Sequence, residues 1–101
     1  MEGEDIPTAI FAVTDNLALG AIEYLIENKY RVPQDIAVVG MGNSKIARVI
    51  TPKLTTIHYN YKTAGRKSAE IILSKLGSEK KEDRVIEKIK LDCLLVERNS
   101  V

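Results

Sequence analysis

The chain has 101 residues, of which 45% are hydrophobic and 29% charged, and its formal net charge is +1. A chain of this length forms one small domain with a modest core, because it buries only about 60–65% of its unfolded surface. The balanced charge excludes a strong field for nucleic acid or membranes. No apolar run approaches the roughly 20 residues of a membrane span, and residues 1–5 are acidic, unlike the start of a signal peptide. We therefore expect a cytoplasmic protein without a membrane partner.

The first half of the chain has the order strand, helix, strand. Residues 7–13 form a nearly all-apolar run, which is typical of a strand covered on both faces, and residues 36–39 form a second one. Between them, Thr14 or Asp15 can cap a helix that Asn16 opens. The apolar residues of this helix form two lines, Leu17, Ala21, Tyr24 and Leu25, and Leu19, Ile22 and Ile26. Either the helix is buried on two sides or one line meets a partner.

The second half adds a third strand and a long helix. Residues 44–53 show no clear pattern, whereas residues 54–59 are rich in β-branched side chains and predict a strand. Asn60 can cap a helix over residues 61–76, and Gly77 ends it. The inward stripe of this helix is Ala64, Ser68, Ile71, Ile72 and Leu76. Residues 85–98 are expected to be extended. Together the elements predict an α/β fold, a parallel sheet joined by right-handed crossovers and flanked by helices.

Few residues are suited to catalysis or metal binding. Cys93 is the single cysteine and His58 the single histidine, so a disulfide, a metal site or a catalytic triad lacks partners within the chain. Asp15 is a candidate acid or base, but a helix cap explains it at least as well. On that interpretation, Asp15→Asn costs at most about 1 kcal/mol. We expect no enzyme activity, no catalytic residues, no metal and no cofactor.

The segment around Gly40 and Gly42 begins like a dinucleotide-binding loop. That loop needs a third glycine, and Lys45 stands in its place. The acidic residue expected about twenty positions further on is also missing, because Asn60 is there. Two glycines that permit a tight bend are the simpler interpretation.

A pair of residues lies just beyond each predicted strand. The pairs are Thr14 and Asp15, Gly42 and Asn43, and Tyr59 and Tyr61. In open parallel sheets, ligands bind beyond the carboxyl ends of the strands. Hydroxyl, amide and aromatic groups at that edge suit a neutral, polyhydroxylated ligand.

The order of motifs resembles the lactose/galactose-repressor family of bacterial transcription regulators. The motifs are residues 7–12, 15–21, 32–40 and 51–57, Gly65, and residues 97–100. The resemblance covers nearly the whole chain. It implies part of an effector domain built like a periplasmic sugar-binding protein, with two α/β subdomains and the ligand between them.

The resemblance also implies how the chain is divided. Residues of about 6–59 would belong to the C-terminal subdomain, and residues of about 60–78 would form a helix of the N-terminal subdomain. Residues of about 84–101 would form the return strand. We therefore expect a C-terminal fragment of the effector domain, whose parent binds DNA through an N-terminal domain that this chain lacks.

Two positions depart from the family at its ligand contacts. An effector-contacting asparagine is replaced by Thr14, and the carboxylate of the loop after the second strand is replaced by Gly42, followed by Asn43. Tyr59 and Tyr61 remain as expected stacking groups, although packing at the helix start explains Tyr61 nearly as well. The resemblance further implies a homodimer, with an interface expected at Leu19, Ile22, Ile26, Val49 and Ile50, unless the chain covers these residues itself.

The function implied is the sensing of a sugar or sugar-phosphate effector by a repressor, coupled to its operator affinity. Two alternatives remain at this point, a periplasmic-type sugar-binding component of a transport system and a small α/β enzyme that uses Asp15.

Overall fold

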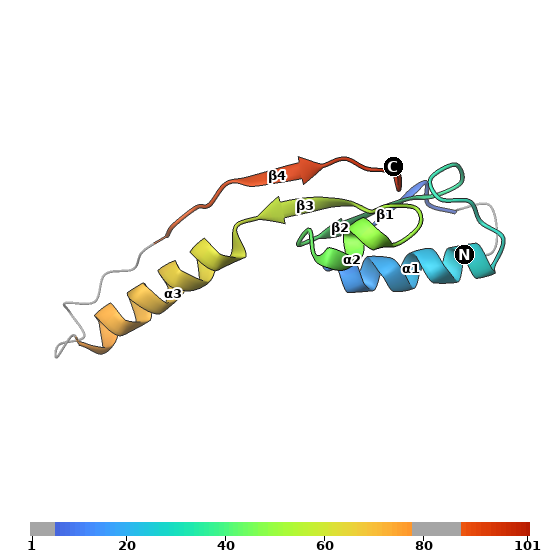
Figure 1. Cartoon of the computed structure of the whole chain (residues 1–101). Coiled ribbons are helices and arrows are strands. Elements are labelled where there is room, and N and C mark those ends of the chain that lie inside the picture. Colours follow the sequence, from blue (N-terminus) through green and yellow to red (C-terminus); the bar gives the residue numbers. More distant parts are fainter. Residues whose placement is uncertain (1–5, 78–87) are drawn as a thin grey trace. The chain divides into compact units, whose positions relative to one another are not determined.

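The computed structural model describes residues 6–77 and 88–101. Along the chain lie β1 (Ala9–Phe11), α1 (Asp15–Glu27), β2 (Ala37–Met41), α2 (Lys45–Val49), β3 (Thr55–Tyr59), α3 (Tyr61–Leu76) and β4 (Cys93–Val96) (Figure 1). The sheet order is β1-β2-β3-β4. The first three strands pair in parallel, with Ile10 opposite Val38 and Gly40 opposite Thr56. Figure 1 shows β4 running opposite to β3, so the α/β fold is confirmed with a mixed, mostly parallel sheet.

The chain divides into two compact units. The first contains Met1–His58 and Leu94–Val101, and the second contains Tyr59–Cys93. The chain thus leaves the first unit at the end of β3 and returns to it in β4. The assignment of these units to two subdomains of a larger domain stays a prediction. Residues 84–87 of the predicted return strand lie outside the described residues.

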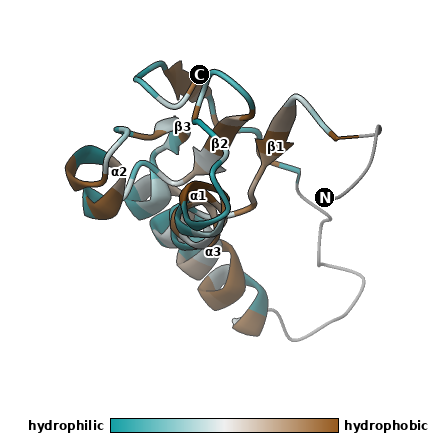
Figure 2. Cartoon of the chain, turned by 90° about the vertical axis from the view of Figure 1, so that its right-hand side faces the viewer, coloured by the Kyte–Doolittle hydropathy of each residue, from teal (hydrophilic) through white to brown (hydrophobic). Residues whose placement is uncertain are grey.

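The core of the first unit lies between the sheet and two helices. Figures 1 and 2 both show α1 and α2 on the same side of β1, β2 and β3. The buried apolar residues are Ala18, Ile22, Leu25, Ile36, Val38, Ala47 and Leu54. Burying each of the larger side chains contributes about 1.5–3 kcal/mol. None of the helices within residues 6–77 and 88–101 is long and apolar enough to cross a membrane.

The predicted burial of the first strand on both faces is wrong. The strand is only three residues long and lies at the edge of the sheet. Ile10 packs against the core below it, whereas Phe11 on the opposite face is 57% exposed. The reason is that the described helices of this unit cover one face of the sheet only.

The predicted interface set is corrected at Ile22, whose side chain is buried in the chain's own core. Ile50 also packs against that core, and Leu19 is half-buried. Ile26 and Val49 remain exposed, and Val49 is 68% exposed. Helix α1 buries Ala18, Ile22 and Leu25, so its inward face takes one residue from each predicted line, and members of both lines remain exposed in the described part of the chain.

Helix α3 of the second unit has the predicted bounds and caps. The Asn60 side chain accepts a hydrogen bond from the Thr63 backbone N–H at 3.0 Å, and Gly77 follows the last turn. The predicted inward stripe, however, is mostly uncovered by the described residues, since Ala64 and Ile71 alone of its members are half-buried. No residue of α3 is buried, and Leu76 at its end is 74% exposed.

The C-terminal Ser100 joins β2 to β3 at their amino ends. Its hydroxyl donates to the Val38 carbonyl at 2.6 Å and accepts from the Thr55 N–H at 2.8 Å. Its backbone carbonyl accepts from the Val38 N–H at 2.9 Å. Ser100 is fully buried, so these groups have no access to water if the hydroxyl is lost.

Replacing Ser100 by alanine should destabilise the protein by about 1–3 kcal/mol, because a buried donor and a buried acceptor lose their partner. Urea unfolding with wild-type and variant protein measures the difference. Ser68→Ala is the matched control, since the Ser68 hydroxyl bonds the Ala64 carbonyl on an exposed helix face. A Ser100→Ala change no larger than the control would contradict the bridging role.

Candidate functional site

The loops that follow β1 and β2 meet at the carboxyl edge of the sheet. Thr14 follows β1 and caps α1, since its hydroxyl oxygen accepts from the Leu17 N–H at 3.1 Å. Its side chain is exposed, so the hydroxyl hydrogen remains able to donate to a ligand. The cap also leaves the next residue, Asp15, free of the capping role that the sequence allowed for it.

Asp15 is the centre of a buried hydrogen-bond network. Its side chain is only 2% exposed. One carboxylate oxygen accepts from the Ser44 N–H at 2.6 Å and from the Ser44 hydroxyl at 2.9 Å. The other oxygen accepts from the Thr56 hydroxyl at 2.6 Å. The carboxylate therefore fastens the loop after β2 and strand β3 to the start of α1.

Gly40 lies inside β2 and leaves room for this carboxylate. A Cβ atom at Gly40 would stand 2.6 Å from an Asp15 oxygen and 2.8 Å from a Leu54 methyl group. The predicted bend therefore lies at Gly42 and Asn43 rather than at Gly40. Gly42 has a φ of 124° and Asn43 a φ of 53°, values that glycine and asparagine adopt more readily than other residues.

The backbone N–H groups of residues 42–44 all point into the protein. Gly42 donates to the Ile57 carbonyl at 2.8 Å, and Asn43 donates to the Thr56 hydroxyl at 3.3 Å. The third N–H, from Ser44, is held by the Asp15 carboxylate. A phosphate-binding loop presents its N–H groups outward to the anion. This loop has the opposite arrangement, which excludes it as a phosphate cradle.

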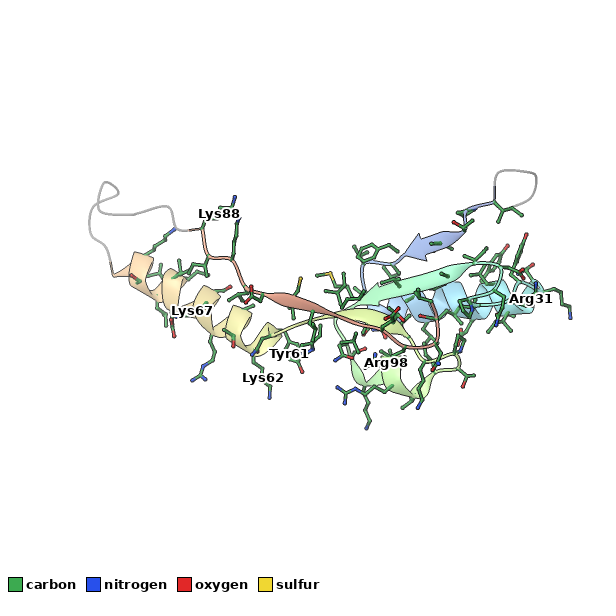
Figure 3. All side chains as sticks on the ribbon, turned by 90° about the horizontal axis from the view of Figure 1, so that it is seen from above. Arg31, Tyr61, Lys62, Lys67, Lys88 and Arg98 are labelled. Atoms are coloured by element: carbon green, nitrogen blue, oxygen red, sulfur yellow. The ribbon has the colours of Figure 1, made fainter. Side chains whose placement is uncertain are left out.

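Asn43 joins the loop to Arg98 and His58. The Arg98 guanidinium donates to the Asn43 side-chain oxygen at 2.7 Å and to the Leu54 carbonyl at 2.8 Å. The Asn43 amide nitrogen lies 3.3 Å from Nδ1 of His58. Figure 3 shows Arg98 on the segment that follows β4, beside the strands of the first unit. The side chain expected to meet a ligand is thus held on both sides.

Tyr59 and Tyr61 belong to the second unit. Their ring centroids are 6.4 Å apart with an interplanar angle of 80°, an edge-to-face pair. Tyr61 is exposed and labelled at the start of α3 in Figure 3. Their proximity to Thr14 and Asn43 stays a prediction.

The network contains residues whose part in it was not predicted. Thr56 and Arg98 lie in motifs that carry the family resemblance, whereas Ser44 begins a segment without a clear pattern. Neither pattern nor spacing connects these residues to Asp15 or Asn43. The contacts join residues 29, 41 and 55 positions apart. One signal was available in the sequence. Asp15 lies just beyond a strand, and because Thr14 can cap the helix, the Asp15 carboxylate is free for another role.

Comparisons with a family model, with curated proteins and with solved structures all point to the same family. The family described as "Periplasmic binding protein-like domain" matches residues 1–101. The "HTH-type transcriptional repressor PurR" of Vibrio atlanticus is 37% identical over 101 residues, which are 100% of this chain and 29% of that protein. The chain therefore spans less than a third of the length of this curated relative.

Two solved structures show the same fold with sugars bound to them. A LacI family transcriptional regulator from Enterococcus faecium with bound ribose is 29% identical, with a TM-score of 0.74 over 95% of this chain and 35% of its own. One from Lactobacillus casei with bound sucrose is also 29% identical, with a TM-score of 0.71 over 94% of this chain and 34% of its own.

Asp15→Asn should destabilise the protein by about 2–3 kcal/mol, more than the loss of a helix cap. The amide removes the charge from a buried acceptor and turns an NH₂ group toward hydroxyl or N–H donors. Urea unfolding at neutral pH measures the change.

Asp35→Asn is the matched control for this substitution. Asp35 pairs with Arg31 at 3.0 Å on the surface, and the Arg31 side chain is 71% exposed. The hydrogen bonds from Arg31 lower the pKa of Asp35, but solvent screens the pair. We expect its loss to change stability little. Equal effects at the two positions would argue against the buried network.

Gly40→Ala should destabilise the protein by about 1–3 kcal/mol, because the added methyl group overlaps the Asp15 carboxylate. The same change at Gly20, in the middle of α1, meets no atom within 4 Å. Gly20→Ala should therefore stabilise by about 0.5–1 kcal/mol. Thermal unfolding measures whether each variant is more or less stable than the wild type. An unchanged stability of Gly40→Ala would show that the short distance between residue 40 and the Asp15 carboxylate is unimportant.

Proposed function

This chain belongs to the family of periplasmic binding protein-like domains, and we propose that it is the effector-sensing part of a bacterial transcriptional repressor of the lactose/galactose-repressor type. The observation that carries the proposal is the match of residues 1–101 to this family together with repressor relatives. These relatives favour a regulator over a transport component or an enzyme. The fold supports the same conclusion, because its polar loops lie at the carboxyl edge of a parallel sheet.

The proposed effector is a sugar or a sugar phosphate, with a neutral sugar favoured. The solved relatives that contain ribose and sucrose support this class. The inward N–H groups of residues 42–44 offer no cradle to a phosphate group, which favours the uncharged form. No cofactor, metal or catalytic step is part of the proposal.

In the proposed site, Thr14 and Asn43 of the first unit contact the ligand, and the stacking role of Tyr59 and Tyr61 stays a prediction. Thr14 offers an exposed hydroxyl, and Asn43 stands at the tip of the loop in a left-handed conformation. Asp15 has a positioning role, since its oxygens are occupied by Ser44 and Thr56. It holds the loop that carries Asn43.

The proposed mechanism is a shift between two arrangements of the effector domain. An effector bound between two subdomains favours the arrangement for which it has higher affinity, and it shifts the equilibrium only by that difference. A homodimer would transmit the change to paired DNA-binding domains, which would lie outside this chain and contact the operator in the cytoplasm. The exposed side chains of Ile26 and Val49, together with the partly covered Leu19, support a partner surface on α1 and α2.

Calorimetry on the protein that contains this chain tests the proposal, with ribose, glucose, sucrose and cellobiose as ligands. We expect saturable binding of at least one sugar, and the same sugar should change operator affinity by about 5–150-fold in a gel-shift assay. Asn43→Ala should weaken sugar binding. Arg31→Ala is the control, because Arg31 lies on the surface in a pair with Asp35 before β2. The proposal is refuted if none of these sugars binds and none changes operator affinity.

A further inference from the structure

His58 is a side chain near the carboxyl edge of the sheet to which the proposed site gives no role. It lies one residue before the end of β3 and is half-buried. Side chains alternate between the faces of a strand, so His58 lies on the same face as Thr56, which bonds Asp15. The ring therefore stands beside the loop that carries Asn43.

The hydrogen bonds around Asn43 determine the orientation of its amide. A guanidinium group can only donate, so the atom facing Arg98 at 2.7 Å must be the amide oxygen. The amide NH₂ group, which can only donate, then faces Nδ1 of His58 at 3.3 Å. Nδ1 must accept in this pair. In a neutral imidazole with Nδ1 as acceptor, the proton is on Nε2.

The Nε2–H group has no hydrogen-bond partner among the residues that the structure describes, since the contact to Asn43 is the one recorded for this ring. It is also not a buried unsatisfied atom there. The donor is therefore open to solvent or to a ligand at the edge of the sheet. One nitrogen is fixed by the protein and the other is available.

We infer that Arg98, Asn43 and His58 form a relay that presents Nε2–H of His58 as a hydrogen-bond donor to the effector. His58 is then a specificity-determining residue, and it selects a ligand with an acceptor oxygen at this position. Arg98 is a positioning residue, which acts through Asn43. The inference rests on the proposed effector function and adds one contact to it.

Relay and ligand contact can be tested separately in the protein that contains this chain. Nitrogen NMR of protein labelled at histidine reports which ring nitrogen carries the proton, without any ligand. We expect the Nε2–H form in the wild type. Asn43→Asp replaces the NH₂ donor by an acceptor, so the ring should change to a state with a proton on Nδ1. An Nδ1–H ring in the wild type, or no change in Asn43→Asp, would overturn the relay.

The ligand contact is tested with whichever of ribose, glucose, sucrose and cellobiose binds the wild type. His58→Leu should weaken binding about 10- to 100-fold, because the acceptor on the sugar loses its hydrogen-bond donor. His58→Gln can place an amide N–H close to the Nε2 position and should keep most of the affinity. Ser100→Ala serves as a control, since it affects stability at the opposite ends of the strands.

Monodeoxy analogues of the bound sugar identify the acceptor. One analogue should lose affinity for the wild type but show little further loss with His58→Leu, which is the sign of a direct pair in a double-mutant cycle. Equal sugar affinity of wild type and His58→Leu would overturn the inference while leaving the proposed function intact. If none of the four sugars binds the wild type, both the inference and the proposed function are overturned.

Discussion

The buried carboxylate of Asp15 is the constraint on which the carboxyl edge of the sheet depends. It joins the start of α1 to the loop after β2 and to strand β3, which lie 29 and 41 residues away in sequence. Removing a charge from water is costly unless hydrogen bonds replace the lost solvation. The donors from Ser44 and Thr56 provide that replacement. Gly40 belongs to the same arrangement, because any side chain there would occupy the space of the carboxylate.

The sequence predicted the elements well where the signal is local. The strand before Asn60, the helix after it and the stop at Gly77 follow from β-branched residues, a capping side chain and a glycine, all of which act within a few residues. The short helix α2 has no side-chain cap, and it was not predicted. Burial of β1 on both faces was overestimated. An apolar run shows that a strand can be buried, but it does not show that other elements cover both of its faces.

The candidate site was predictable in position but not in detail. Polar residues after successive strands placed Thr14, Asp15 and Asn43 at one edge, and the structure brings the loops of these residues together. Their separate roles follow from distant partners that no periodic pattern encodes. Arg98 stands 55 residues from Asn43, and its contact depends on the return of the chain after the second unit.

The discontinuity of the first unit has a consequence for biosynthesis. The ribosome releases β1, β2, β3 and both covering helices early, but Arg98 and Ser100 emerge only after the entire second unit has been made. Until then the nascent sheet lacks its fourth strand and the bridge that ties Val38 to Thr55. Contacts between such distant residues form late, because the intervening chain must first be closed into a loop. A growing polypeptide of this kind therefore carries an open sheet edge that chaperones can recognise, until β4 and the segment that contains Arg98 and Ser100 have emerged.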